Sequence, residues 1–468
     1  MASTDFLRWH WLSLHGFVTV LALGLFLAAS HSLRQRRNPS AAMAWMLFFM
    51  LVPYLALPLY LLIGTRKRAR PLSVVRAAAP ARAGVPALRI RLLVGTLSLP
   101  EPSTCDSFEL HEDGSQALRS LLSMIDSARS RLDLCTFVFG RDVLGREIVR
   151  HLEQAARRGV RVRFMVDGFG RYLGGRPDLG PLKRAGVSVA LFAPPLAFPF
   201  AGKANLRNHR KMAIADGERF WIGGRNFAAE YFEGDSQLHP KEPAWVDLSF
   251  ELCGAIAGQA QEQFDKDWEF AAHPHAAVAS QSPTPIVPDA ACSVQLVPSG
   301  PDQADDTVYT LLVSCCFTAK TRILAVSPYF VPDATLQMAL TLAARRGVSV
   351  DLFIPHRSNH PIADMARHAS LRELSRAGAR VWMTPGMIHA KAVVFDDEFA
   401  LAGTANLDER SLLLNYEMMV GFYRPEDVQR FAGWILRQRE GALPYEARSP
   451  GVARELREGV IRWLAFQL

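Results

Sequence analysis

The feature that most constrains this chain is a motif that occurs twice at a fixed separation. One copy begins at His209 and the other at His389, and each follows the pattern His-x-Lys-x4-Asp. In both copies the Asp is followed ten residues later by an asparagine in a Gly-x-x-Asn segment, Asn226 and Asn406. All shared positions keep one offset along the chain. Two copies in register indicate two related halves that each supply half of a site.

The sequence around the motifs alternates between buried strand patterns and helical patterns. The helix end Ala155–Val160 is nearly restated as Ala343–Val348, so the repeat includes the scaffold as well as the motifs. This order predicts an α/β fold with a largely parallel sheet in each half. The expected strands are residues 132–139, 160–166 and 187–192 in the first half and 322–326, 348–354 and 380–383 in the second.

Two apolar stretches precede the repeat. They run from Trp11 to Ala29 and from Ala41 to Ile63, near the ~20 residues that a membrane-spanning helix needs. We expect two transmembrane helices, although Pro53 and Pro58 would allow a kinked or re-entrant second segment. A cleaved signal peptide is disfavoured because the second stretch follows so soon. More basic residues follow the second stretch than lie between the two, which predicts that the large region after it lies in the cytoplasm.

The expected domain boundaries follow from these changes in composition. A segment rich in Ala, Arg and Pro follows the apolar stretches, and a second Ser/Pro-containing segment separates the halves. The divisions are a membrane anchor over 1–70, a linker over 71–87, a first half over 88–272, a linker over 273–290 and a second half over 291–468.

The residue types of the motif suit a phosphodiester substrate. In an extended strand His209 and Lys211 face the same side, and Asp216 with the following glycine forms a turn into a second strand. One imidazole can attack phosphorus while the other protonates the leaving alkoxide, and ammonium and amide groups can neutralise the phosphate oxygens. No cluster with metal-ligand spacing accompanies the motif, so we expect no metal and no other cofactor.

These residues resemble the HKD signatures of the phospholipase D superfamily. Within it, the chain is similar to bacterial cardiolipin synthases along nearly its whole length. The similarity is carried by the two motifs and by three further segments, Arg37–Trp45, Ser327–Asp333 and Gly403–Glu417. The resemblance implies two phospholipase D-like α/β/α halves in one pseudo-twofold unit, preceded by two N-terminal transmembrane helices. It also implies a multi-pass protein of the bacterial inner membrane.

The activity implied by the resemblance is transfer of a phosphatidyl group between two phosphatidylglycerol molecules through a phosphatidyl-histidine, with release of glycerol. The implied partners are phosphatidylglycerol and an anionic membrane, which the formal charge of +8 suits, and no nucleic acid. A hydrolase of the phospholipase D type and a synthase that uses phosphatidylethanolamine as co-substrate remain alternatives. The implied catalytic set is His209, Lys211, Asp216, His389, Lys391 and Asp396, with Asn226 and Asn406 on the phosphate.

Within this set the resemblance assigns finer roles. His209 is expected to be the nucleophile and His389 the general acid and base. Glu417 is expected to orient His389, and Asp247 occupies the similar position in the first half. The two motif aspartates lie in turns, which favours a structural role over direct catalysis. His356 and His360 follow a strand end, where they either line the mouth of the pocket or lie in a solvated loop.

Overall fold

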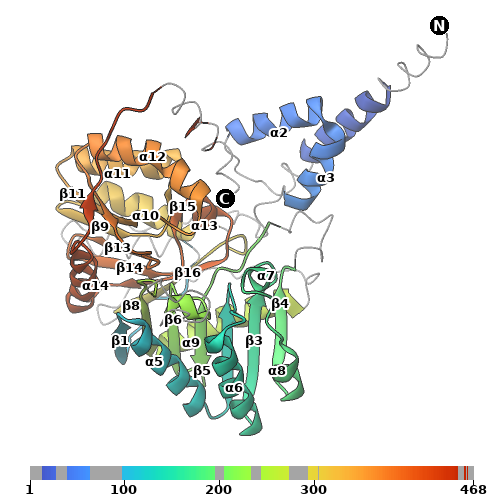
Figure 1. Cartoon of the computed structure of the whole chain (residues 1–468), viewed down its shortest axis with the longest axis vertical. Coiled ribbons are helices and arrows are strands. Elements are labelled where there is room, and N and C mark those ends of the chain that lie inside the picture. The colour runs from blue at the N-terminus through green and yellow to red at the C-terminus, as the bar shows by residue number, and fades with distance from the viewer. Residues whose placement is uncertain are drawn as a thin grey trace.

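A computed structural model of the chain describes residues 13–27, 39–63, 97, 99–194, 205–232, 244–272, 293–303, 305–451, 458–459 and 461. Figure 1 shows two α/β halves, one in blue-green to yellow-green and the other in yellow to red, stacked along the long axis. Each half is built around one large mixed sheet.

The first half contains a seven-stranded sheet in the order β1-β7-β6-β5-β2-β3-β4. Its strands are β1 (Ser107–His111), β2 (Arg131–Thr136), β3 (Arg161–Asp167), β4 (Ser188–Phe192), β5 (Met212–Ala215), β6 (Arg219–Gly223) and β7 (Ser249–Cys253). The helical elements are α5 (Gly114–Ser127), α6 (Val143–Arg157), α7 (Gly170–Leu173), α8 (Gly180–Arg184), the 3-10 turn η1 (Ala229–Tyr231) and α9 (Ala255–Ala272).

The second half contains an eight-stranded sheet in the order β17-β12-β11-β9-β13-β14-β16-β8, and β10 and β15 pair separately. Its strands are β8 (Val294–Ser299), β9 (Arg322–Val326), β10 (Phe330–Val331), β11 (Ser349–Pro355), β12 (Arg380–Thr384), β13 (Ala392–Phe395), β14 (Phe399–Gly403), β15 (Leu407–Asp408), β16 (Glu417–Phe422) and β17 (Leu443–Pro444). The helices are α10 (Thr307–Thr318), α11 (Ala334–Arg345), α12 (Pro361–Arg376), α13 (Glu409–Leu413) and α14 (Pro425–Arg437).

The expected α/β alternation is confirmed, but the expectation of largely parallel sheets is wrong. Only β2, β3 and β4 pair in parallel in the first sheet, and only β9, β11 and β12 do so in the second. The remaining pairings within both sheets are antiparallel, because each motif is itself a hairpin whose first strand joins the parallel part. The sheets are therefore mixed.

The restated helix ends share one backbone geometry. Gly159 after α6 and Gly347 after α11 have φ values of 87° and 90°, the left-handed conformation that glycine adopts without a steric penalty. In both places the next residue is a valine, whose N–H donates a hydrogen bond to a carbonyl near the end of the helix, at 3.2 and 3.1 Å. This arrangement ends the helix and turns the chain into the following strand.

The two halves share one hydrophobic core. A single cluster joins Met212, Phe250 and Phe264 of the first half to Phe422 and Phe431 of the second. Separate clusters lie under α5 and α6 in the first half and under α10 and α11 in the second. The halves therefore form one packed body with an internal pseudo-twofold arrangement.

A buried ion cluster reinforces the contact between the halves. Arg210 is fully buried and pairs with Asp267 of its own half. Across the interface its guanidinium donates to the backbone oxygens of Glu417 (3.0 Å) and Ser299 (3.2 Å) and contacts Asp302 at 3.3 Å. Because a buried charge is costly unless it is paired, these contacts favour the docked arrangement.

The N-terminal stretches differ from the expectation of two long helices. One helix covers residues 13–27, and the second stretch is divided into α2 (Pro39–Leu51) and α3 (Pro53–Ile63). Pro53 cannot donate the backbone hydrogen bond that a continuous helix requires, so the division falls at the residue before it. Among the described residues, no helix combines the length and the apolar character that crossing a membrane requires.

Replacing Arg210 with Met should destabilise the body by about 3–5 kcal/mol, because the buried Asp267 and the partly buried Asp302 would lose their cation. Thermal unfolding followed by circular dichroism measures the change. The matched variant Arg219→Met removes a less buried pair with Glu251 and should cost about 1 kcal/mol. Equal losses in the two variants would contradict a special role for the interface cluster.

Candidate active site

Each motif enters a β-hairpin, as expected. His209 and Lys211 immediately precede β5, and His389 and Lys391 immediately precede β13. The turns after β5 and β13 carry Asp216 and Asp396 with φ values of 56° and 53°. Aspartate tolerates this left-handed conformation better than most residues do. The start of each hairpin thus places an imidazole and an ammonium at the end of the sheet that faces the other half.

The two motif aspartates hold the turns. The Asp216 carboxylate accepts backbone N–H groups from Arg129, Ser130 and Arg131 at 2.8–2.9 Å. Asp396 accepts the corresponding N–H groups of residues 320–322, at the start of β9. These hydrogen bonds tie each hairpin to the neighbouring parallel strand. These contacts favour the structural role of both aspartates, and their inclusion in the catalytic set stays a prediction.

Backbone hydrogen bonds place each histidine against the opposite half. The His209 N–H donates to the Tyr416 carbonyl (2.9 Å), and the His389 N–H donates to the Val246 carbonyl (2.7 Å). In both cases the bonded residue directly precedes an acidic residue. The two contacts therefore have the same register on the two sides of the pseudo-twofold interface.

The acidic partners are exchanged between the halves. His209 Nδ1 lies 2.9 Å from Glu417 Oε1, and His389 Nδ1 lies 2.8 Å from Asp247 Oδ2. The expectation that Glu417 orients His389 is wrong, and so is its counterpart for Asp247. The physical reason is the docking of the halves. It brings the histidine before each motif strand next to the acidic residue of the other half.

One repeat position adapts each half to its own acid. At Gly224 a Cβ atom would lie 2.1 Å from Asp247 Oδ1, so glycine leaves the room that this carboxylate occupies. The equivalent residue of the second half is Thr404, whose hydroxyl donates to Glu417 Oε2 at 2.5 Å. Gly224 therefore leaves space for the Asp247 carboxylate, and Thr404 hydrogen-bonds the Glu417 carboxylate.

Two buried arginines, neither of them among the site residues expected from the sequence, hold the backbone of the acidic residues. Arg210 donates to the Glu417 carbonyl, and Arg225 donates to the carbonyls of Asp247 and Tyr231. Both lie at variable positions within the motif segments, where the second half has alanines. In the sequence, these arginines were marked only by their positions inside the repeated segments. The carbonyl groups that they bond are known only from the folded structure.

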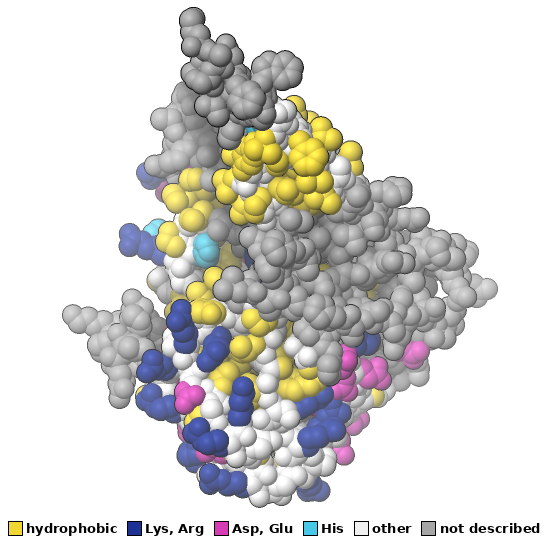
Figure 2. Space-filling view, turned by 90° about the vertical axis from the view of Figure 1, so that its right-hand side faces the viewer, with side chains coloured by type: hydrophobic (Ala, Val, Ile, Leu, Met, Phe, Trp, Pro, Cys, Tyr) yellow, Lys and Arg dark blue, Asp and Glu magenta, His cyan; other side chains and the backbone are white. Residues whose placement is uncertain are grey.

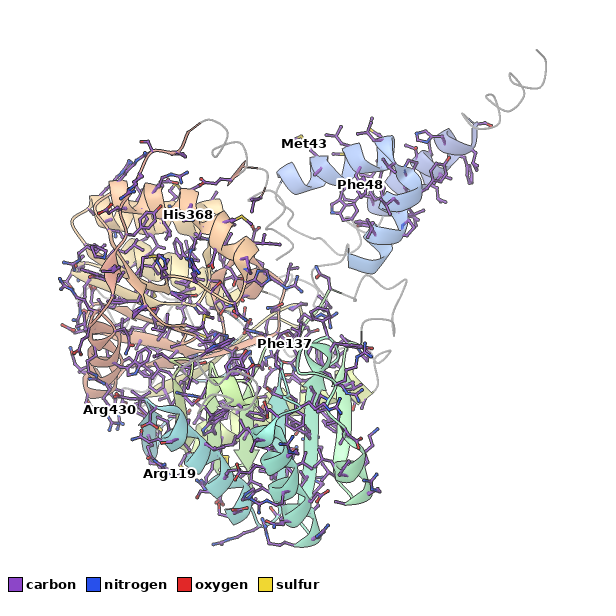
Figure 3. All side chains as sticks on the ribbon, viewed as in Figure 1. Met43, Phe48, Arg119, Phe137, His368 and Arg430 are labelled. Carbon is purple, nitrogen blue, oxygen red and sulfur yellow. The ribbon has the colours of Figure 1, made fainter. Side chains whose placement is uncertain are left out.

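The lysines and several aromatic rings complete the site. Lys211 Nζ donates to the His209 carbonyl (2.6 Å), and Lys391 Nζ lies 3.1 Å from His389 Nε2. The His209 ring packs against Phe137, which Figure 3 shows at the junction of the two halves. The centroids of these two rings are 5.1 Å apart. The His389 ring lies between two aromatic residues of the first half, Tyr231 (5.0 Å) and Trp245 (5.5 Å).

The two asparagines are buried and differ in their contacts. Asn226 Oδ1 accepts the Val138 N–H at 3.0 Å, and its amide also hydrogen-bonds Tyr231. Asn406 Nδ2 donates to Ser411 at 3.1 Å, while its Oδ1 has no hydrogen-bond partner among the described residues. Their assignment to substrate phosphate remains a prediction.

Burial controls the protonation of the site. Burial lowers the pKa of His209 to about 4 and of His389 to about 3, and the nearby lysines add to this effect. Burial likewise lowers the pKa of Lys211 to about 7 and of Lys391 to about 8. The four groups interact electrostatically across the interface, so they belong to one site.

The carboxylates stay ionised in this environment. Burial opposes the charge of Glu417, but His209, Lys211 and a hydrogen bond from Thr404 outweigh it and lower its pKa. Burial also opposes the charge of Asp247, and its contacts with His389 and Lys391 lower its pKa in the same way. Over the described part of the chain, no group of three or more His, Cys, Asp or Glu side chains has a metal-holding arrangement.

Two similar α/β halves that share one pair of His/Lys motifs define the class of protein as the phospholipase D superfamily. Residues 121–268 and 312–438 match the family described as cardiolipin synthase, PLD-like domain. Residues 23–64 match a family described as phospholipase D-nuclease N-terminal. The fold is similar to that of phosphatidylserine synthase from Haemophilus influenzae, with a TM-score of 0.56 at 13% identity over 82% of this chain and 100% of that one.

The family follows from curated relatives. The major cardiolipin synthase of Bacillus subtilis is 31% identical over 427 residues, which are 86% of this chain and 87% of the relative. Cardiolipin synthase A of Pseudomonas aeruginosa is 32% identical over 428 residues, 86% of this chain and 85% of the relative. The chain belongs to the cardiolipin synthase family and is a phosphatidyltransferase that acts on phospholipid substrates.

The exchanged pairing predicts the outcome of double-mutant cycles. Stability changes for His209→Ala and Glu417→Gln should be coupled by about 0.5–3 kcal/mol, because the two side chains are in contact. The cycle for His389→Ala and Asp247→Asn should show the same coupling. Cycles between His209 and Asp247 should be closer to additive. Thermal unfolding of the unmodified chain and of each single and double variant gives the coupling energy of each pair. A stronger coupling between a histidine and the acidic residue of its own half would contradict the structure.

The low histidine pKa values predict an acid-sensitive fold. An unfolded histidine has a pKa of about 6.5, so between pH 6.5 and 4 the unfolded state binds more protons than the folded state. This contribution to stability is complete above pH 6.5 and is lost as the pH falls. The double variant His209→Gln, His389→Gln should lose less stability between pH 7 and pH 4.5 than the unmodified chain. Equal losses in thermal unfolding would refute the depressed pKa values.

Proposed function

We propose that this chain transfers a phosphatidyl group from one phosphatidylglycerol to the hydroxyl of another, forming cardiolipin and releasing glycerol. The observation that carries the proposal is the pair of buried histidines, each hydrogen-bonded at Nδ1 to an ionised carboxylate of the other half. Two such histidines in one site suit a reaction with two displacements at the same phosphorus.

In the first displacement His209 is the nucleophile. Glu417 accepts a hydrogen bond from the Nδ1–H group of His209. The lone pair of Nε2 is therefore available to attack phosphorus. The N–P bond forms, the bond from phosphorus to the glycerol oxygen breaks, and the leaving oxygen takes a proton from His389. The carboxylates compensate the positive charge that develops on each ring.

In the second displacement the hydroxyl of another phosphatidylglycerol attacks the phosphatidyl-histidine. His389 takes the hydroxyl proton, an O–P bond forms and the N–P bond of His209 breaks. Lys211 and Lys391 provide positive charge for the phosphate oxygens, assisted by Asn226 and Asn406. The bound phosphate also raises the histidine pKa values, since its negative charge favours the imidazolium form.

We also propose that the chain works at a bacterial inner membrane with its catalytic body in the cytoplasm, and that the expected domain boundaries apply. Large exposed hydrophobic side chains crowd the N-terminal helices, including Phe17, Val20, Leu47 and Leu55. In the view of Figure 2, hydrophobic side chains gather in the upper part, Lys and Arg lie over the left and centre of the lower part, and Asp and Glu gather at its right. Apolar helices next to a basic body suit an anionic bilayer.

The full chain, purified in detergent, should convert phosphatidylglycerol labelled in its glycerol headgroup into cardiolipin and free labelled glycerol. Lipid mass spectrometry and counting of released glycerol measure both products. His209→Ala and His389→Ala should each lower cardiolipin output by at least about 1,000-fold.

A matched control is His151→Ala, because His151 also pairs with a carboxylate, Asp126, at 2.6 Å, but this pair joins α6 to α5 within the first half. This variant should retain full activity. Phosphatidic acid without cardiolipin would replace the proposal with a hydrolase. Cardiolipin formed only when phosphatidylethanolamine is added would replace it with a mixed-substrate synthase.

A further inference from the structure

The two halves differ where the first parallel strand of each sheet ends beside the site. The hydroxyl of Thr136 donates to the Val138 carbonyl (2.8 Å), and the hydroxyl of Ser327 donates to the Tyr329 carbonyl (2.7 Å). Each hydroxyl also accepts the N–H that follows the motif asparagine, at 3.2 and 3.0 Å. Matching contacts make Val138 and Tyr329 equivalent, so one half presents an aliphatic side chain where the other presents a phenol.

The phenol belongs to a polar group on the second half. Tyr329 Oη donates to Asn359 Oδ1 at 2.5 Å, and the Tyr329 ring lies 6.0 Å from the His360 ring. Asn359 is exposed and lies between β11 and α12, and Tyr329 and His360 are half-buried. His360 therefore contacts this polar group, and its place at the mouth of the pocket stays a prediction.

This polar group adjoins His389. Val326, the last residue of β9 before Ser327, pairs with Ala392, which directly follows Lys391. Asp408 pairs with Val331 in the short β10–β15 ladder, two residues after Tyr329. Hydroxyl, amide and carboxylate groups therefore gather on the His389 side of the site.

The side of the site next to His209 is different. Phe137 packs against the His209 ring at 5.1 Å and lies 5.7 Å from Lys211 Nζ. Val138 stands where the other half has the phenol. At this pair of equivalent positions, the His209 side of the site carries an aliphatic side chain and the His389 side carries a hydrogen-bonding phenol.

We propose that Tyr329, Asn359 and Asp408 form a subsite for a vicinal diol, the glycerol headgroup of phosphatidylglycerol, on the His389 side. The inference rests on the transfer reaction proposed above and adds where its alcohol binds. One subsite serves both displacements, since the glycerol that leaves and the headgroup that attacks exchange a proton with the same histidine.

The chemistry of the three side chains fits a diol. A phenol both donates and accepts hydrogen bonds, an amide supplies two donors, and a carboxylate accepts. A site built to hydrogen-bond a hydroxyl discriminates against an analogue that lacks it, because its own polar groups are then left unpaired. The subsite should therefore favour glycerol over an alcohol with a single hydroxyl.

The test compares two alcohols that react with the same intermediate. The full chain in detergent receives phosphatidylglycerol with either labelled glycerol or labelled ethanol. Attack by either alcohol forms an O–P bond, breaks the N–P bond of His209 and delivers the alcohol proton to His389. Labelled phosphatidylglycerol and phosphatidylethanol are then measured over a range of alcohol concentrations.

Tyr329→Phe and Asn359→Ala should each lower the ratio of kcat/KM for glycerol to that for ethanol by about fivefold to tenfold, mainly through a higher KM for glycerol. The matched control is Tyr423→Phe. It removes a phenol that donates to the amide oxygen of Gln295 (2.7 Å) at the β8–β16 edge of the second sheet, and it should leave the ratio unchanged.

An unchanged ratio in both site variants would overturn the subsite. An equal loss with both alcohols would also overturn it, because that result indicates a structural role for these side chains. If the unmodified chain makes cardiolipin, either outcome refutes the subsite alone. If the unmodified chain transfers phosphatidyl groups to no alcohol, the proposed function fails and the subsite fails with it.

Discussion

The contact on which the rest of the site depends is the hydrogen bond between each histidine and the carboxylate of the opposite half. Neither half supplies both the motif histidine and the carboxylate bonded to it, because Glu417 bonds His209 and Asp247 bonds His389. The shared core and the buried Arg210 cluster therefore have a functional consequence. They hold the two sheet edges in the register at which both pairs form.

Burial is the second determinant of the site. It disfavours charge on both histidines and both lysines, and the two ionised carboxylates offset part of that penalty. In a site of this kind a bound phosphate brings negative charge. This charge interacts favourably with the lysine ammonium groups and stabilises a protonated histidine ring. The electrostatics are thus set by exclusion of water as much as by the identity of the motif residues.

The halves share a scaffold but have diverged around it. Arg210 and Arg225 of the first half hold the backbones of both acidic residues, and the second half has alanines at both equivalent positions. Gly224 and Thr404 adapt to carboxylates of different length, and Val138 and Tyr329 place an aliphatic side chain and a phenol at equivalent positions. A symmetric scaffold therefore carries an asymmetric site.

The sequence by itself determined the repeat, the alternation of strands and helices, the two hairpins and the histidines and lysines before them. These features depend on local patterns, such as i and i+2 positions in a strand and an aspartate in a turn. Only the tertiary structure decided the mixed sheets, the division before Pro53, the arginine contacts and the exchange of acidic partners. His209 and Glu417 are separated by 208 positions, and the docking of two hydrophobic sheet faces brings them together. No local pattern encodes which half supplies the acid.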